Sequence, residues 1–429
     1  MPKHKRLKKV AHDDRVPQGG QYSIATITLA VQLVVDAGSS LRGSSAAMNT
    51  FVERGFADFR VPAASTIRSW ILRLGLFALN RPLDKTQPWF WLMDHTIQIG
   101  SKKLLVILGG CLHQVRFGQR ALALSELQLV ALVPMDTSNG SLVERELELA
   151  ALRTGVPQLI VSDQGGDLVK GISNYRELRP AVKHVLDVAH FGANLLERSW
   201  ESQPRWSEFL TQIQQTSSKL RQSKVAELTA PQLRPKGRFL NLGVLLRFVS
   251  LLLLRLDAAK PEATVQEHYG WLREYREPLA TWLAEHHLVR TTIRHLRVEG
   301  LHGRSRLELH RVWRVLGLGE RPHLRALAKH WCDYVRQHQP SEGSVRYVAS
   351  TEVLESSFGK LKRVSGQQSR SGLTGLVLAM GTVVGSLSDD EVRQGLESTP
   401  QKKVDSWVGR CIGRTVQWLR RRFLKNSSD

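Results

Sequence analysis

Cysteine is scarce in this sequence. Only Cys111, Cys332 and Cys411 occur in 429 residues, and no two of them form a Cys-x-x-Cys pair. Disulfide frameworks and structural zinc sites need cysteines at close, regular spacing, so the sequence supports neither. Scattered free cysteines are typical of proteins that fold in a reducing compartment. We therefore expect the protein to be cytoplasmic.

Long hydrophobic runs are also missing. The most apolar stretch, Leu242 to Leu256, contains Arg247 and Arg255, whereas a bilayer span needs about 20 nearly uninterrupted apolar residues. The basic N-terminal segment is not followed by an apolar core, which is not the pattern of a signal peptide. The sequence contains no Gly-x-x-x-x-Gly-Lys-[Ser/Thr] phosphate-binding loop. We expect no membrane insertion and no use of ATP.

Acidic residues are few relative to basic ones. The sequence has 61 Lys plus Arg against 39 Asp plus Glu, which gives a formal net charge of +22. Such an excess favours a polyanionic partner, because each neutralised phosphate releases condensed counterions. A ribosome-associated or merely basic protein would satisfy the charge as well. Charge and domain pattern together favour nucleic acid.

The length suggests about three domains, and changes in composition and periodicity divide the chain into six parts. We expect a basic flexible arm (1–20), a helix-turn-helix domain (21–80), the first part of a core domain (88–198), an all-α insertion (199–342), the last helices of the core (343–395) and a basic tail (396–429).

The N-terminal domain shows three short helical segments. The third follows Pro62, and its apolar residues, among them Ile67 and Trp70, recur at helical spacing. When that stripe faces the domain core, four polar residues point outward, where a DNA major groove could receive them: Thr66, Arg68, Ser69 and Arg73. A small three-helix bundle without DNA contact is the alternative.

The core domain has a recognisable order of elements. Apolar segments predict strands over 89–100, 103–115, 127–137 and 157–163, and a short strand running into a helix over 181–191. A helical pattern separates the third and fourth strands. Three strands, a helix, a strand, a helix and a strand is the order of an RNase H-like core. We expect an α/β fold with such a core, interrupted by the all-α insertion.

Two aspartates stand at positions suited to a metal site. Asp94 lies among apolar and aromatic residues of the first strand, and Asp163 ends the segment 157–163 before two glycines. A carboxylate among such neighbours is costly unless it meets a cation or several donors. Carboxylates on neighbouring strands could hold two Mg²⁺ ions, for which Mn²⁺ could substitute. A strand-end aspartate satisfied by backbone donors explains either residue alone equally well.

A third carboxylate lies on a predicted helix over 350–363. There Glu355 lies near the edge of an apolar stripe that contains Leu354 and Phe358, and it faces the sheet. Lys362 follows two turns later on the same side. Glu352, one turn before Glu355 and nearer the solvent edge, is the competing candidate. We favour Glu355 because of its place beside Leu354 and Phe358.

These motifs resemble the DDE transposases of bacterial insertion sequences. An aspartate in a first strand, a Ser-Asp-x-Gly turn after a later strand and a helix reading Glu-x-x-Phe-x-x-x-Lys are the pattern of that superfamily. The resemblance implies that Asp94, Asp163 and Glu355 are the metal ligands. The last motif is similar to the group with a Tyr-Arg-Glu-Lys signature. In that group the Lys contacts the DNA end, and Lys362 takes its place.

The match to the Tyr-Arg-Glu-Lys group is partial. Thr351 stands where that group has its Arg, and Val348 where it has its Tyr, with Tyr347 one residue out of register. A hairpin-forming mechanism is therefore not implied. The segment from Asp187 to His190 resembles an Asp-x-x-His element that supports the active site or target strand in some relatives, so His190 could contact DNA. A helix N-cap with a histidine packed behind it is the alternative.

The resemblance implies a transposase that binds the terminal inverted repeats of a mobile element. Such an enzyme nicks the 3′ ends with Mg²⁺ and joins them to target DNA. It also implies double-stranded DNA as the partner, a homodimer on that DNA, and association with a bacterial nucleoid. Two other functions stay open here. One is a regulator that binds DNA without chemistry, and the other is a nuclease of the same fold that cuts without joining.

The insertion adds two features. It contains six tryptophans, of which one, such as Trp313, could stack on a displaced base, although most residues of this type pack in a core. A run of arginines is compatible with either a solvated helix face or phosphate contact. The run consists of Arg294, Arg297, Arg304, Arg306, Arg311 and Arg314.

Overall fold

The computed structural model describes most of the chain in two compact units. The described residues are 15–97, 102–233, 239, 241–317, 321–341, 344–366, 373–385 and 387–426, so most of the expected N-terminal arm lies outside them. One unit is formed by 1–115, 122–183 and 351–429, and the other by 116–121 and 184–350. The second unit thus begins before the expected insertion boundary at 199 and ends after 342.

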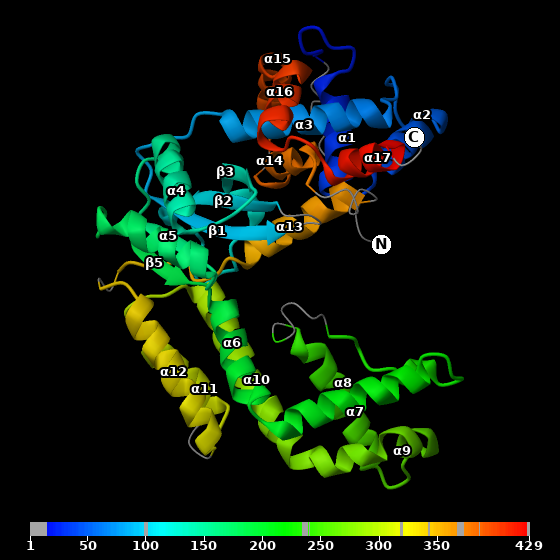
Figure 1. Cartoon of the computed structure of the whole chain (residues 1–429), viewed down its shortest axis with the longest axis vertical. Helices are drawn as coiled ribbons and strands as arrows, with labels where there is room; N and C mark the ends of the chain where they lie inside the picture. The colour runs from blue at the N-terminus through cyan, green and yellow to red at the C-terminus, as the bar shows by residue number, and fades with distance from the viewer. Residues whose placement is uncertain are drawn as a thin grey trace, which may run out of the picture. The chain divides into compact units, whose positions relative to one another are not determined.

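The first unit contains a mixed five-stranded sheet with the strand order β3-β2-β1-β4-β5 (Figure 1). β1 is antiparallel to β2 and parallel to β4, and β2 is antiparallel to β3. The strands are β1 (Trp89–Ile97), β2 (Lys103–Cys111), β3 (Gln128–Met135), β4 (Leu159–Ser162) and β5 (Lys183–Leu186), within which the chain passes into the second unit. These positions confirm the strands that the apolar runs predict.

Both faces of β1 are buried. Trp89, Trp91 and Met93 pack in a core with α4 (Gly140–Thr154) and α5 (Gly166–Glu177). Because side chains alternate along a strand, Phe90, Leu92 and Asp94 face the other side of the sheet. Phe90 and Leu92 are fully buried there. This double burial explains why β1 reads as a nearly continuous apolar segment.

The C-terminal part of the chain returns to pack on the N-terminal helices. These are α1 (Ile24–Val35), α2 (Leu41–Glu53) and α3 (Ala64–Asn80). α3 contacts α1, α2, β3 and four later elements. The later elements are η7 (Gly375–Ala379), α14 (Met380–Val383), α15 (Asp389–Ser398) and α16 (Gln401–Cys411). α3 is therefore a central helix of its unit, enclosed on several sides (Figure 1).

Two glycines allow α3 to meet the η7–α14 segment backbone to backbone. A Cβ on Gly75 would lie 1.9 Å from the carbonyl oxygen of Leu378. A Cβ on Gly381 would lie 2.5 Å from the carbonyl oxygen of Gly75. Glycine inside a helix costs roughly 0.5–1 kcal/mol relative to alanine. The close approach of the two backbones, which a larger residue would prevent, offsets that cost.

The first unit contains four further elements among the described residues. They are η1 (Leu112–Gln114), η2 (Leu124–Glu126), α13 (Glu352–Ser365) and α17 (Val416–Asn426). α13 contacts β1, η7, α14 and α1.

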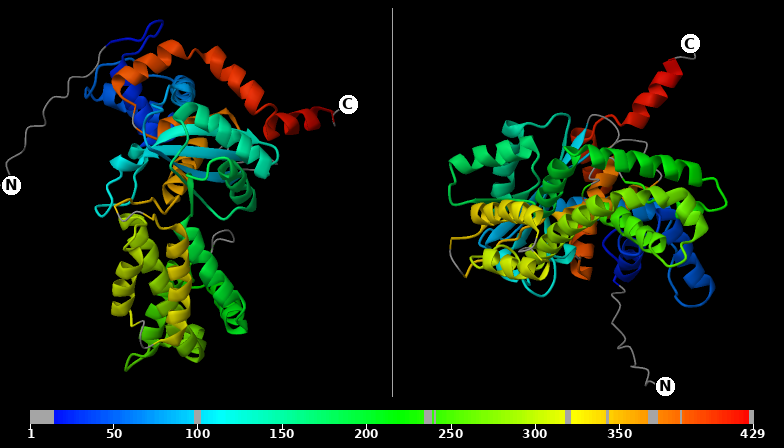
Figure 2. Two further views of the ribbon diagram at one scale, coloured as in Figure 1. Left: turned by 90° about the vertical axis from the view of Figure 1, so that its left-hand side faces the viewer. Right: turned by 90° about the horizontal axis from the view of Figure 1, so that it is seen from below.

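The second unit is helical, as its composition predicts (Figure 2). Its helices are α6 (Val188–Glu201), α7 (Pro204–Leu220), α8 (Leu242–Leu256), α9 (Ala263–Tyr269), α10 (Arg276–Glu299), α11 (Ser305–Val315) and α12 (Pro322–His338), with the short turns η3 (Ala226–Leu228) and η5 (Gly270–Tyr275).

Tryptophans form much of the core of the second unit. Trp200, Trp206 and Trp282 pack together, with ring centroids 4.8 to 6.1 Å apart. The indole of Trp200 donates to Glu285, whose pKa is raised by burial. Trp313 is fully buried and donates to Thr292 Oγ1 at 2.7 Å. The idea that Trp313 stacks on a displaced base is therefore wrong, because the ring is enclosed by protein.

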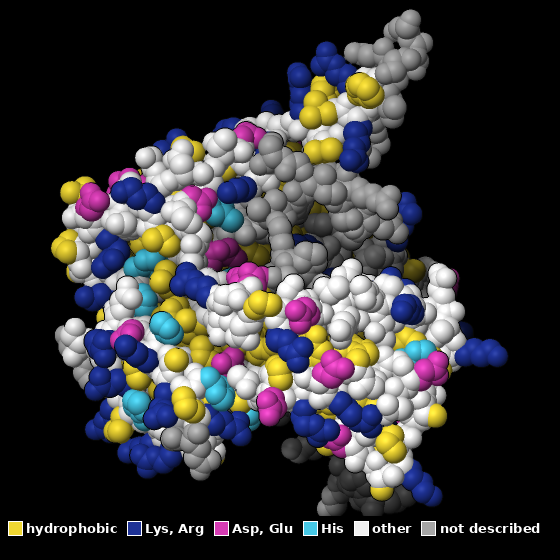
Figure 3. Space-filling model, turned by 60° about the horizontal axis from the view of Figure 1, so that its bottom comes forward, with side chains coloured by type: hydrophobic (Ala, Val, Ile, Leu, Met, Phe, Trp, Pro, Cys, Tyr) yellow, Lys and Arg dark blue, Asp and Glu magenta, His cyan; other side chains and the backbone are white. Residues whose placement is uncertain are grey.

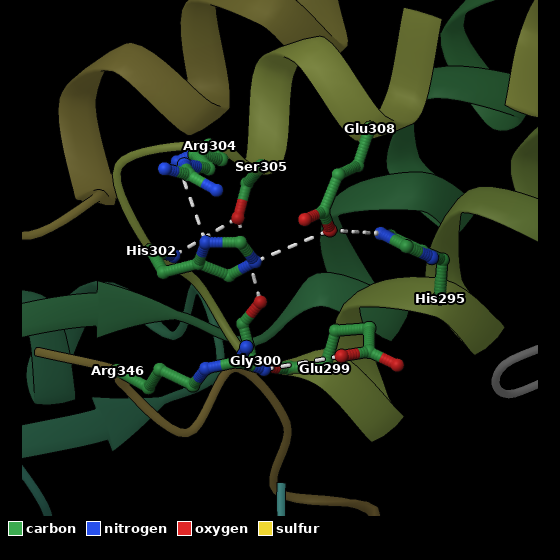
Figure 4. A network of polar contacts seen from close by, with 8 residues as sticks. All are labelled: His295, Glu299, Gly300, His302, Arg304, Ser305, Glu308 and Arg346. Atoms are coloured by element: carbon green, nitrogen blue, oxygen red, sulfur yellow. Dashed lines mark hydrogen bonds and ion pairs between the residues drawn. The ribbon is translucent and has the colours of Figure 1, made fainter. Parts of the chain in front are cut away.

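A polar network fixes the turn between α10 and α11 (Figure 4). His295 Nε2 and His302 Nε2 both lie 3.2 Å from Glu308 Oε2. The backbone amide of Arg304 donates to His302 Nδ1 at 3.3 Å, so the buried His302 carries its proton on Nε2. The turn itself needs Gly300, whose φ is +72°. The network holds two helices of one unit together.

No helix among the described residues is both long and apolar enough to cross a membrane. α8 buries Leu242, Leu245 and Val249 and leaves Val244 and Leu251 exposed.

Gly75→Ala should destabilise the protein strongly. The new methyl group would overlap the Leu378 carbonyl, and overpacking of this kind costs about 1–3 kcal/mol or more. Gly409 of α16 is the matched control, since a Cβ there meets nothing within 4 Å. Gly409→Ala should be neutral or stabilise by roughly 0.5–1 kcal/mol. Urea unfolding followed by circular dichroism compares the two, and equal midpoints would contradict the close contact.

Candidate active site

Asp94 lies on β1, on the face opposite to α4 and α5. It follows Phe90 and Leu92 in the alternation of the strand and is only half-buried, unlike those two residues. Its Oδ1 accepts a hydrogen bond from the backbone amide of His95 at 2.6 Å. A polar group thus breaks the apolar face near the end of β1.

Asp163 is brought to the same level as Asp94 by the strand pairing. β1 and β4 pair in parallel, and Met93 stands opposite Ser162. Asp94 directly follows Met93, and Asp163 directly follows Ser162. We therefore expect the two backbones to lie roughly one strand spacing, about 4.8 Å, apart. Asp163 Oδ1 accepts from the backbone amide of Gly165 at 3.0 Å. A Cβ on Gly165 would lie 3.1 Å from that oxygen, which is why the tight turn favours glycine.

α13 carries the third carboxylate and packs against β1. Leu354, Phe358 and Leu361 are its buried stripe. Glu355 and Lys362 are seven residues apart and so lie within about 20° of each other around the helix axis, on one flank of that stripe.

Glu352 and Glu355 differ in exposure and in direction. Glu355 is exposed and Glu352, at the first position of α13, is half-buried. Burial alone would favour Glu352. Helical geometry places Glu352 roughly opposite the buried stripe and Glu355 about 100° from it. On that geometry Glu355 stays the preferred candidate for the third carboxylate.

The three carboxylates do not form a closed metal cage. Among the described residues, no group of three or more His, Cys, Asp or Glu is arranged to hold a metal ion. The aspartate pair nevertheless suits Mg²⁺, which prefers oxygen ligands and is often held by one or two carboxylates together with water and phosphate. Asp94 and Asp163 directly follow the paired residues Met93 and Ser162, and Glu355 lies on α13, which contacts β1.

A second polar cluster lies beside Asp163, and sequence reasoning assigned no role to it. Asp167 Oδ2 lies 3.7 Å from His95 Nδ1 and 3.6 Å from Lys103 Nζ. Burial raises the pKa of Asp167, but a hydrogen bond from Ser138 and the nearby positive charge outweigh it and leave the pKa lowered. Burial lowers the pKa of the His95 imidazole, against the opposing effect of Asp167. The only feature of the sequence that pointed to this cluster was the Asp-x-x-x-Asp spacing of Asp163 and Asp167 across the turn.

His190 belongs to the second unit. Asp187 is the N-cap of α6 and its Oδ1 accepts from both the backbone amide and Nδ1 of His190, at 2.7 and 2.9 Å. Asp187 is buried and His190 half-buried. This is the arrangement of the N-cap alternative, and a contact of His190 with DNA stays a prediction.

The four polar residues of α3 predicted to contact DNA differ in whether they form hydrogen bonds with the C-terminal part of the chain. Ser69 Oγ donates to Gln401 Oε1 at 2.7 Å. Arg73 Nε donates to the carbonyl of Thr399 at 2.7 Å, and Nη2 donates to the carbonyl of Leu396. Thr66 and Arg68 are half-buried and take no part in these bonds. The α15–α16 connection therefore occupies two of the four side chains.

Comparison with known proteins adds little. No family model matches the chain, and no curated protein matches it in sequence. Among solved structures, the chain is similar to a Drosophila P element transposase strand transfer complex. The identity is 10%, the match covers 89% of this chain and 94% of that chain, and the TM-score is 0.42. A likeness of that strength decides neither fold nor activity.

Arg73→Ala should lower the stability of the protein itself. It removes hydrogen bonds from a half-buried guanidinium to two carbonyl groups, and bonds to charged groups are worth about 1.5–3 kcal/mol. Arg68→Ala, one turn earlier on the same helix, should change stability by less than about 0.5 kcal/mol. Thermal unfolding of the two variants measures the difference. Equal melting temperatures would show that the α3–α15 contact is not as described.

Proposed function

We propose that this chain is a metal-dependent enzyme that cuts and joins DNA, a transposase of the DDE type with an RNase H-like core. The observation that carries the proposal is that Asp94 and Asp163 directly follow Met93 and Ser162, which pair across neighbouring parallel strands. The element order β1-β2-β3-α4-β4-α5-β5 agrees with the order expected of such a core. The net charge of +22 agrees with DNA as the substrate.

Asp94, Asp163 and Glu355 are the residues that would hold Mg²⁺, or Mn²⁺ in its place. Two bound ions supply an activated water and stabilisation of the leaving 3′ oxygen. The chain's own contribution is positional. β1 and β4 fix the aspartates one strand spacing apart, and the Gly165 amide orients one of them. In the proposal Lys362, on the same flank of α13 as Glu355, contacts a backbone phosphate.

Basic side chains of the second unit support DNA as the partner. Figure 3 shows Lys and Arg side chains gathered over α11 and α12. The exposed ones are Arg304, Arg306, Arg311, Arg314, Arg321, Arg325, Lys329 and Arg336. Such a face suits the duplex backbone, where charge rather than base sequence is read. A homodimer that holds two element ends belongs to the same proposal.

A DNA-binding regulator without chemistry is the second candidate. It is favoured by one observation: within the described part of the chain, the three carboxylates are not arranged as a metal site. The charge and the basic face would serve a regulator equally well. Only a test of chemistry separates the two functions.

Asp94→Asn and Asp163→Asn should each abolish Mg²⁺-dependent 3′ nicking of DNA that carries the element's own ends. Loss of a ligand leaves the metal weakly held, so we expect a decrease of about 100-fold or more. Asp136→Asn is the matched control, since Asp136 is exposed and bonded to Lys102. A strand-specific cleavage assay with Mg²⁺, Mn²⁺ or EDTA gives the result.

Three outcomes of that assay lead to different functions. Nicking and joining by the wild type, lost in both aspartate variants with end binding intact, supports the transposase. Cutting without joining identifies a nuclease. End binding with no cleavage under either metal identifies the regulator and ends the enzyme proposal.

Glu355→Gln should abolish nicking while Glu352→Gln leaves it within about threefold of wild type. The reason is direction around α13: by helical geometry Glu355 lies closer to the buried stripe of the helix than Glu352, which lies roughly opposite that stripe. The two variants carry the same chemical change one helical turn apart, so each controls for the other. The reverse pattern in the same assay would assign the third position to Glu352.

A further inference from the structure

A groove runs between the C-terminal end of α3 and α16, within the first unit. Its volume is about 710 Å³. Apolar side chains form part of its lining, with Trp407 almost fully buried. These apolar residues are Leu76, Phe77, Pro82, Pro400 and Trp407.

The charged side chains that line the groove are all cationic among the described residues. They are Arg81, Lys402, Lys403 and Arg410. Arg81 is paired with Glu391 at 2.5 Å, and Lys403 Nζ donates to the carbonyl of Ser398 at 2.9 Å. Lys402 and Arg410 are exposed at the rim. The groove therefore presents uncompensated positive charge around an apolar floor.

The start of α16 adds to this positive charge. Its N-cap is Pro400, and no side chain caps the first turn, which carries Lys402 and Lys403. Backbone amides and the helix dipole already make a helix N-terminus positive, so cations there are unfavourable and an anion is favoured. The preceding helix shows the usual pattern, because α15 begins with the cap Ser388 and three acidic residues. The first turn of α16 is thus arranged for an anion from outside the chain.

We propose that this groove binds phosphate groups of a duplex DNA backbone. The proposal rests on the proposed function for DNA as the partner, and adds a second place of contact in the unit that holds the carboxylates. Contact is with the backbone rather than with bases, because Ser69 and Arg73 on the adjoining turns of α3 are bonded to the chain itself. An acidic peptide is the competing occupant, and the experiment separates the two.

The test is the affinity of the full chain for DNA as a function of salt. The variant Lys402→Gln/Arg410→Gln is compared with Lys224→Gln/Lys260→Gln, which removes two exposed cations of the second unit. The probe is a fluorescein-labelled duplex of about 30 base pairs of random sequence, followed by anisotropy in EDTA. We expect about tenfold weaker binding at low salt for the groove variant. The slope of log K against log salt should fall by roughly 1–2, because each lost phosphate contact removes about 0.9.

Further variants keep the test decisive. Lys402→Arg/Arg410→Lys retains the charge and should bind within about twofold of wild type. If the double glutamine variant has a lowered melting temperature, Arg410→Gln alone is used, with an expected slope change of about 0.9. Affinity and slope equal to those of the control variant would overturn the proposal. Loss of poly-L-glutamate binding with DNA binding unchanged would overturn it in favour of an acidic peptide.

The experiments distinguish failure of the groove proposal from failure of the proposed enzyme function. Binding in EDTA needs no cleavage, so the groove can be confirmed for a regulator. Conversely, the enzyme could be active while its groove variant binds DNA like the control variant. The proposed carboxylate site would then stand, and only the proposal for the groove would be rejected.

Discussion

Direct backbone contact between α3 and the η7–α14 segment is the constraint on which the first unit depends. Gly75 and Gly381 let the two backbones meet where any Cβ would overlap a carbonyl. The same segment contacts α13, and α13 contacts β1. A contact made by residues about 300 positions apart in the chain thus determines where α13 lies against the sheet. The third carboxylate, Glu355, is positioned through this sequence of contacts rather than by its own neighbours in the sequence.

The same contact changes the role of α3. A recognition helix must leave one side open to the major groove. α3 instead is covered by helices from both ends of the chain, and Arg73 is held by the carbonyl groups that end α15. Thr66 and Arg68, near the start of the helix, are the polar residues left for DNA. The N-terminal helices therefore have a structural role in holding α13, whatever contact they make with DNA.

Sequence reasoning predicted what depends on local pattern and missed what depends on distant partners. Apolar runs gave the strands and the position of Asp94 and Asp163, because burial on both faces leaves a continuous signal. The sequence suggested that the two aspartates lie on neighbouring strands, but the register that pairs Met93 with Ser162 is not encoded in either segment alone. The outward face of α3 was inferred from one apolar stripe, yet Thr399, 326 residues from Arg73, covers it. The role of Trp313, in the core or in base stacking, was left open for the same reason, because its hydrogen-bond partner Thr292 lies on another helix.

The candidate site combines two kinds of restraint. Asp94 lies on β1 and Asp163 directly follows β4, and each accepts a backbone amide hydrogen bond that offsets part of their mutual repulsion. Glu355 is exposed on α13, which contacts β1, η7, α14 and α1 and is joined to Asp36 by the Lys360 ion pair. In the proposed enzyme, strand pairing would therefore restrain the two aspartates, and the packing of α13 would restrain Glu355. Because α13 also carries Lys362, the same packing would position a phosphate contact and a candidate metal ligand. DNA binding and assembly of the metal site would then be linked through one helix.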